Sequence, residues 1–124
     1  MTGGTDSPAP DALLILSDTL RRFSAERDWD QFHTPKNLAI ALSVEAAELL
    51  EHFQWISDEN SMRLTPEQME KVREEMADVL LYLVRLADKL NVDIIQAATL
   101  KIERNAEKYP ADKARANSKK YTEL

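Results

Sequence analysis

The chain has 124 residues, of which 44% are hydrophobic and 31% charged, and its net charge is −6. This size and composition fit one globular domain rather than a disordered chain. The negative charge argues against a nucleic-acid polymer as partner, and the absence of any apolar run near 20 residues argues against a membrane partner. The sequence also lacks cysteine and the basic and apolar regions of a signal peptide, so we expect a cytoplasmic protein.

The N-terminal half begins with small residues and prolines, which predict a flexible leader over 1–11. Leucines at helical spacing then predict an amphipathic helix over 12–27, and the segment 28–33 has no helical pattern. Thr34-Pro35 predicts the start of a second helix, with Thr as N-cap and Pro in the first turn. This helix is expected to run to about Ile56.

The C-terminal half contains two more helix signals. The polar stretch 57–64 is expected to be a loop, and the capping-box spacing of Thr65 and Gln68 predicts a third helix to about residue 90. Asn91 can end that helix in the left-handed conformation. A further capping signal over 93–96 predicts a fourth helix, which Pro110 stops near Tyr109.

These elements predict an all-α fold, a four-helix-bundle-like protomer over residues 12–110, followed by a charged tail over 111–124. The third helix also carries an oligomer signal. Between Met76 and Ala87 only Asp78 and Arg85 are charged, and a helix that is apolar nearly all round is buried on several sides. A four-helix monomer rarely covers one helix fully, so we expect a dimer or a larger assembly.

Two helices each carry an acidic pair at i, i+3, namely Glu45 with Glu48 and Glu75 with Asp78. Helical periodicity places Glu45 within an apolar stripe and Glu75 at the edge of another. A buried, unpaired carboxylate costs several kcal/mol, so either Lys and Arg partners or a cation must compensate. Oxygen ligands without His or Cys suit Mg²⁺ or Mn²⁺. The alternative is a pair of ordinary solvated helix faces.

A carboxylate bundle for metal storage is a rival interpretation, but such bundles use Glu-x-x-His. His52 has Leu49 three residues before it, so this motif is absent.

The remaining candidates are basic and aromatic. Lys101 and Lys108 lie on one stripe of the fourth helix and could hold phosphate oxygens, or could be solvated partners of nearby glutamates. Trp29 and Trp55 are the better candidates for stacking on a nucleobase, while ordinary core packing suits Phe53. His33 is expected to be a hydrogen-bonding or capping residue rather than a catalyst.

The two acidic pairs resemble the metal motif of the MazG-like all-α NTP pyrophosphohydrolases. Longer strings are similar to the dCTP pyrophosphatase branch of this family, and the similarity covers roughly residues 13–123. The strings are Phe23-Ser24-Ala25-Glu26-Arg27-Asp28-Trp29-Asp30-Gln31-Phe32-His33, Pro35-Lys36-Asn37-Leu38, Phe53-Gln54-Trp55, Asp78-Val79-Leu80-Leu81-Tyr82-Leu83, Lys101 to Asn105, Tyr109-Pro110 and Lys120-Tyr121-Thr122.

The resemblance implies a site and an assembly. Glu45, Glu48, Glu75 and Asp78 would bind Mg²⁺, with Mn²⁺ as a substitute, and Trp29 and Trp55 would line a base pocket. Lys101 and Asn105, with Tyr82 and Tyr109, would contact the phosphates or the sugar. The protein would be a homodimer or homotetramer with sites built near the subunit contacts.

The resulting hypothesis is cleavage of a nucleoside triphosphate, dCTP or a modified dCTP, to a monophosphate and pyrophosphate, in keeping with nucleotide-pool housecleaning. A metal-activated water would attack the α-phosphate, and Glu48 or Glu45 would accept its proton. Two rivals stay open beside metal storage. One is an enzyme resembling phosphoribosyl-ATP pyrophosphatase, and the other is a non-catalytic helical dimer module.

Overall fold

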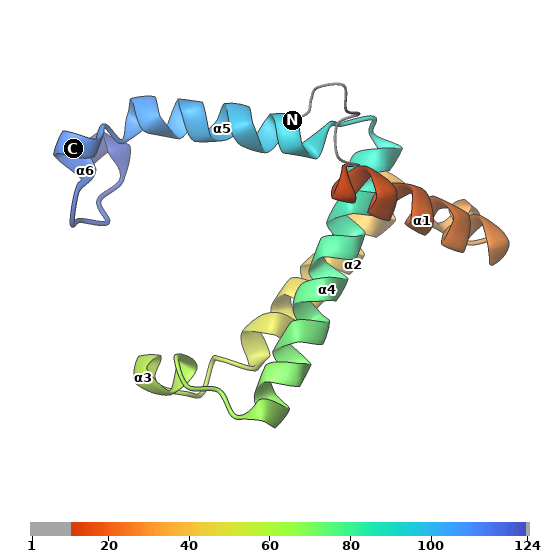
Figure 1. Cartoon of the computed structure of the whole chain (residues 1–124), viewed down its shortest axis with the longest axis horizontal. Helices are drawn as coiled ribbons and strands as arrows, with labels where there is room; N and C mark the ends of the chain where they lie inside the picture. The colour runs from red at the N-terminus through yellow and green to blue at the C-terminus, as the bar shows by residue number, and fades with distance from the viewer. Residues whose placement is uncertain (1–10, 124) are drawn as a thin grey trace, which may run out of the picture. The chain divides into compact units, whose positions relative to one another are not determined.

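We analysed a computed structural model of the chain, which describes residues 11–123, with only the backbone of Tyr121 (Figure 1). The described residues form helices and turns and contain no strand, so the all-α class is confirmed. The chain divides after Asn91 into two compact units, 1–91 and 92–124. The predicted leader lies outside the described residues up to Pro10.

The first unit begins with α1 (Ala12–Glu26), whose N-cap Asp11 accepts hydrogen bonds from the backbone N–H groups of Leu13 and Leu14. A 3-10 turn, η1 (Asp30–Phe32), lies within the segment that has no helical pattern. Helix α2 (Pro35–Glu51) starts as predicted, because the Thr34 side chain accepts from the backbone N–H of Asn37.

Helix α2 ends five residues before the predicted end at Ile56. After Glu51 the backbone N–H groups bond to carbonyls only three residues earlier. The N–H of His52 donates to the carbonyl of Leu49 at 3.3 Å, and the N–H of Phe53 donates to the carbonyl of Leu50 at 2.8 Å. Trp55 therefore lies in a turn rather than on a helix flank. The stretch expected to be a loop also contains a short helix, α3 (Asp58–Ser61), which the Ser57 hydroxyl caps.

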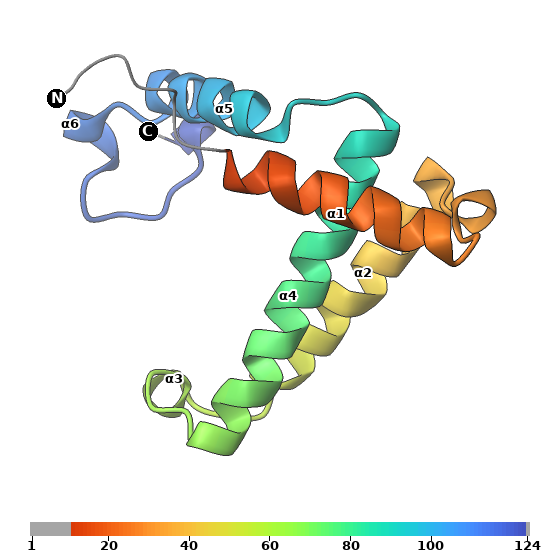
Figure 2. The ribbon, with the colours of Figure 1, turned by 45° about the vertical axis from the view of Figure 1, so that its right-hand side comes forward.

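Helix α4 (Pro66–Lys89) has the predicted capping box, with Thr65 and Gln68 each bonding the other's backbone N–H. Asn91 follows with φ of 54°, as predicted. Helices α2 and α4 run side by side in both ribbon views, and α1 packs on α4 (Figures 1 and 2). Because the chain reverses direction through α3, α2 and α4 are antiparallel, and side chains from both helices meet along their length.

The second unit begins with α5 (Ile94–Lys108), which Asp93 caps by accepting from the backbone N–H of Gln96. Pro110 ends it, as predicted, and the tail contains a short helix, α6 (Ala111–Ala114), and a 3-10 turn, η2 (Tyr121–Glu123). Among the helices described in both units, none is both long enough and apolar enough to cross a membrane.

The buried side chains of the described residues are few. The apolar ones are Leu38, Val72, Val84 and Ala87, and the polar ones are Ser24 and Arg85. Large apolar side chains remain exposed on α4, including Met76 at 58% and Leu80 at 43%. The apolar stretch of α4 is thus only partly covered within its own unit. The four-helix-bundle arrangement, the boundaries 12–110 and 111–124, and the oligomer remain predictions.

Candidate active site

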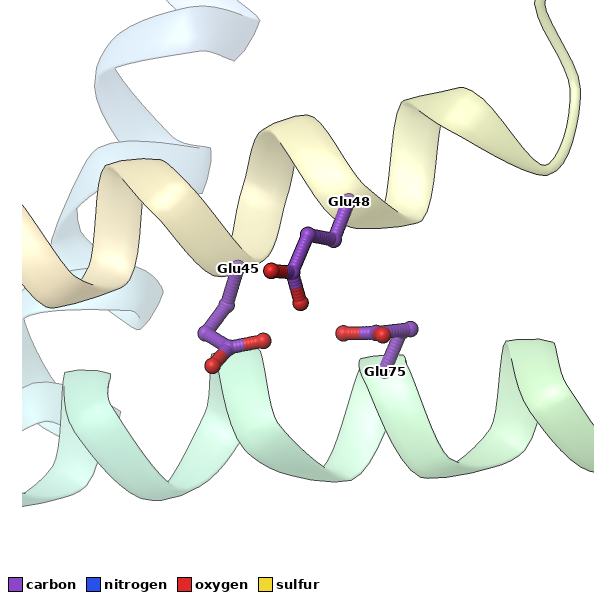
Figure 3. A group of neighbouring side chains, drawn as sticks. All are labelled: Glu45, Glu48 and Glu75. Atoms are coloured by element: carbon purple, nitrogen blue, oxygen red, sulfur yellow. The ribbon is translucent and has the colours of Figure 1, made fainter.

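Three of the four predicted carboxylates meet between α2 and α4. Glu45 and Glu48 project from α2 and Glu75 from α4, and one carboxylate oxygen of each lies within 4.8 Å of the others (Figure 3). The i, i+3 spacing places the first two on one face of α2. The antiparallel packing of α4 then brings Glu75 opposite them. All three side chains are part-buried.

This cluster concentrates negative charge that no side chain described by the structure compensates. Oε2 of Glu45 and Oε2 of Glu75 are buried and have no hydrogen-bond partner. No Lys or Arg within residues 11–123 forms an ion pair with these acids or with Asp78. Of the two compensations predicted, the described residues supply no Lys or Arg partner, and the three acids could hold a cation.

The electrostatics of Glu45 point the same way. Burial is the first cause that raises its pKa, to about 7, followed by the neighbouring carboxyl groups of Glu75 and Glu48 and then by the negative charges of Glu48 and Asp78. A charged Glu45 is thus unfavourable here unless a positive charge joins the cluster. Three convergent carboxylates with two unsatisfied oxygens fit a hard divalent cation.

Asp78 connects this acidic cluster to a cavity. It lies one turn after Glu75 on α4, part-buried, and its charge acts on Glu45. It also lines a cavity of about 190 Å³ between α1, η1 and α4, together with Trp29, His33, Tyr82 and apolar side chains. Pockets that enclose a drug-sized ligand measure roughly 300–1,000 Å³. This cavity can therefore enclose one ring system, with the rest of a larger ligand outside.

Trp29 forms an aromatic wall of the cavity. Its ring meets Phe23 edge-on, with centroids 5.6 Å apart and an interplanar angle of 69°, and it is 43% exposed. The ring of His33 lies 6.3 Å away. A braced but accessible indole of this kind can stack on a planar ligand.

A buried arginine, Arg85 on α4, holds this wall in place. Its side chain is 5% exposed and forms an ion pair with Asp30, the neighbour of Trp29. It also donates to Asp88 at 2.9 Å and, through Nε, to Nδ1 of His33 at 3.2 Å. Asp88 in turn accepts from Arg21 of α1 at 2.5 Å. These bonds fasten α1 and the 28–33 segment to α4.

The structure does not bring all the predicted site residues together. Trp55 is 86% exposed in the turn after α2 and does not line the cavity. Lys101, Asn105 and Tyr109 belong to α5 and its C-cap, in the second unit. By contrast, Tyr82 lies in the cavity beside Trp29.

Two residues of the site were missed as such in the sequence. Arg85 stood out only as a charge within an apolar stretch. His33 was predicted to be a hydrogen-bonding or capping residue, and its bond from Arg85 confirms the hydrogen bonding, but its place in a cavity was not predicted. Both line the cavity. The signal for Arg85 was available, because a charged residue surrounded by apolar ones on a buried helix needs partners. Those partners, Asp30 and His33, are more than 50 positions away in the chain and could not be identified from sequence spacing.

The structure defines an all-α protein with a carboxylate cluster that could hold a metal ion, beside a small aromatic cavity, and comparison with known proteins specifies its family. The profile of the MazG-like family matches residues 40–124. The chain is 44% identical to dCTP pyrophosphatase 1 of Homo sapiens, over 99% of this chain and 78% of that protein. It is 45% identical to dCTP pyrophosphatase 1 of Mus musculus, over 95% of this chain and 70% of that protein.

A solved structure agrees with these relatives. The crystal structure of a pyrophosphatase from Archaeoglobus fulgidus matches with a TM-score of 0.79 and 42% sequence identity, covering 85% of this chain and 98% of that one. The chain belongs to the MazG-like family.

Proposed function

We propose that this protein is a Mg²⁺-dependent nucleoside triphosphate pyrophosphohydrolase that cleaves dCTP, or a modified dCTP, between the α- and β-phosphates. Its products are a nucleoside monophosphate and pyrophosphate. The observation that carries the proposal is the uncompensated cluster of Glu45, Glu48 and Glu75, next to a cavity of base size. The relatives named dCTP pyrophosphatase 1 support the substrate. The same similarity supports a role in the nucleotide pool, and with it a cytoplasmic location.

The four acids act at the triphosphate of the substrate. Glu45, Glu48, Glu75 and Asp78 hold the metal, whose chemistry when bound is to activate a water and to neutralise phosphate charge. Glu48 or Glu45 accepts the proton of the attacking water.

The cavity side recognises the base. Trp29 stacks on the ring, and its packing against Phe23 keeps the indole in place before the ligand arrives. Asp78 lines the cavity and also adjoins the acidic cluster. When the base of the nucleotide lies in the cavity, its sugar and phosphates therefore extend toward the acids. Tyr82 contacts the sugar from the same wall.

Three further contacts are proposed from the resemblance alone. Lys101 and Asn105, with Tyr109, contact the phosphates or the sugar. Trp55 is 86% exposed, and tryptophan is enriched at protein–protein interfaces. We infer that Trp55 reaches a base pocket across a subunit contact of a homodimer or homotetramer, which also covers Met76 and Leu80.

The test is product analysis after incubation with each triphosphate, with and without Mg²⁺. We expect monophosphate and pyrophosphate only with metal, and most product from dCTP. Glu48→Gln should abolish turnover while nucleotide binding persists. Release of single phosphates, or turnover that resists removal of the metal, would contradict the proposal. No turnover, together with no metal-dependent change in melting temperature, would favour a non-catalytic helical module.

A further inference from the structure

Two sides of the cavity are formed by elements that must be held against α4. One side is α1, which contributes three lining residues, Leu20, Phe23 and Ser24. The other side is the 28–33 segment, which contributes Trp29 and His33. Within α1, all of which the structure describes, Ser24 is the only buried residue. Apolar burial therefore fixes α1 only loosely, and polar contacts to α4 gain importance for the shape of the cavity.

Both sides are tied to the same carboxylate of α4, that of Asp88. From α1, Arg21 donates to it with two atoms, Nη2 to Oδ1 at 2.5 Å and Nε to Oδ2 at 3.2 Å. Arg85 donates through Nη1 to Oδ2 at 2.9 Å. The other nitrogens of Arg85 bond to Asp30 and His33 of the 28–33 segment. Asp88 thus connects α1, through Arg85, to the segment that carries Trp29.

The two arginines differ in how much the fold depends on them. The side chain of Arg85 is 5% exposed, so its charge requires the carboxylates beside it. The side chain of Arg21 is 55% exposed, so water can solvate its charge when Asp88 does not hold it. Arg21 does not line the cavity. Loss of its guanidinium should therefore affect the position of α1 more than the stability of the fold.

We propose that Arg21 is a positioning residue for the base pocket. Its two-atom bond to Asp88 fixes both the distance and the direction of α1 relative to α4. Two residues further along α1, the ring of Phe23 meets Trp29 edge-on at 5.6 Å. Without the Arg21 bond, α1 shifts against α4, and Trp29 loses the contact that orients it before the ligand arrives. The inference rests on the proposed function for the ligand, a nucleotide whose base lies in the cavity.

Arg21→Gln removes the guanidinium and keeps most of the aliphatic stem. We expect KM for dCTP to rise about two- to fivefold, the effect of one partly exposed ion pair. The kcat should stay unchanged, since α2 and α4 supply the acidic cluster. Arg22, the next residue of α1, provides the matched control. It is exposed and takes part in none of the ion pairs of the described residues, so R22Q should leave KM unchanged.

A double-mutant cycle with Trp29→Ala distinguishes positioning from a general loss of stability. If Arg21 acts through Trp29, R21Q should raise KM little in the W29A background, because the side chain that it positions is already absent. Equal rises in KM in the W29A and wild-type backgrounds would overturn the inference, as would an unchanged KM in R21Q alone.

The fluorescence of Trp29 gives a reading that is independent of turnover. Trp55, the other of the 2 tryptophans, is replaced by Phe in every protein of this comparison, so that the signal comes from Trp29 alone. We expect acrylamide to quench W55F/R21Q more strongly than W55F, and W55F/R22Q to the same degree as W55F. Equal quenching in all three proteins would contradict the positioning role. If the wild type cleaves no nucleotide, the proposed function fails, while the quenching still decides whether Arg21 orients Trp29.

Discussion

Replacing Glu45 with Gln should have opposite effects on stability in the absence and presence of a divalent metal. Without metal, the raised pKa means that the folded protein holds this proton more tightly than the unfolded chain does. As the pH rises from 4.5 through about 7, the unfolded chain loses the proton first, and the folded state becomes relatively less stable. The penalty is absent below pH 4.5 and complete above about pH 7. Gln carries no such penalty.

The magnitude follows from the same pKa. A shift from 4.5 to about 7 corresponds to roughly 3 kcal/mol at pH 8. Because the side chain is only part-buried, solvent screening reduces this to about 1–2 kcal/mol. E45Q should therefore be more stable than the wild type in EDTA by about that amount. For a chain of this length the difference is roughly 3–10 °C in melting temperature.

Bound metal reverses the order of the two proteins. Mg²⁺ at about 100 times its dissociation constant stabilises a single-site protein by roughly 2.7 kcal/mol, and E45Q lacks one charged ligand for it. The wild type should gain on the order of 10 °C, and the variant much less. The reversal is more diagnostic than either shift alone, because general damage to the fold lowers the melting temperature under both conditions.

The assay is thermal unfolding at pH 8 in EDTA and in saturating MgCl₂, repeated in EDTA at pH 5, where the difference in melting temperature between the two proteins should narrow. E74Q is the matched control, because Glu74 is an exposed acid on α4, next to Glu75 of the cluster. It should behave like the wild type in all conditions. If E45Q melted below the wild type both with and without metal, the carboxylate would be satisfied by the protein itself, and the metal-site argument would be refuted.

Three further predictions concern the cavity wall and the helix cap. Trp29→Ala should raise KM for dCTP about tenfold in steady-state kinetics, since one stacked base contributes roughly 1–3 kcal/mol. Asp88→Asn should lower the free energy of unfolding in urea by on the order of 3 kcal/mol, because it removes a partner of the buried Arg85. The bond from Arg21 is the first cause that lowers the pKa of Asp88. The stabilisation from this bond is therefore complete above pH 3.8 and is lost as the pH falls through the lowered pKa. The free energy of unfolding of D88N should therefore fall less than that of the wild type as the pH is lowered. Thr65→Ala should cost about 1 kcal/mol in the same urea assay by removing the α4 cap.

The local signals in the sequence were sufficient for most of the helices. Thr34, Thr65 and Asp93 each cap the helix that they were expected to start, and Asn91 takes the left-handed conformation expected of it. These features depend on residues within a few positions of one another, so spacing alone predicts them. The end of α2 was wrong because the change to tighter turns after Glu51 leaves no distinctive residue in the sequence.

The acidic site was predicted in part. The i, i+3 pairs contain the three acids that the structure brings together, because one helix turn fixes which residues share a face. The sequence could not show that Glu45, Glu48 and Glu75 converge within 4.8 Å, since this depends on how α2 and α4 pack. Trp55 shows the reverse case. Its residue type suggested a base pocket, and the structure leaves it exposed in its own chain.

The sequence by itself therefore determined the helices, their caps and the acids that a cation would need, because each of these is set by near neighbours along the chain. Only the tertiary structure decided which acids meet, which aromatic ring walls the cavity and which side chains bond to the buried Arg85. Those outcomes depend on contacts such as the one between Arg85 and His33, 52 positions apart. Contacts of that range form only when α1, α2 and α4 bury their apolar faces together.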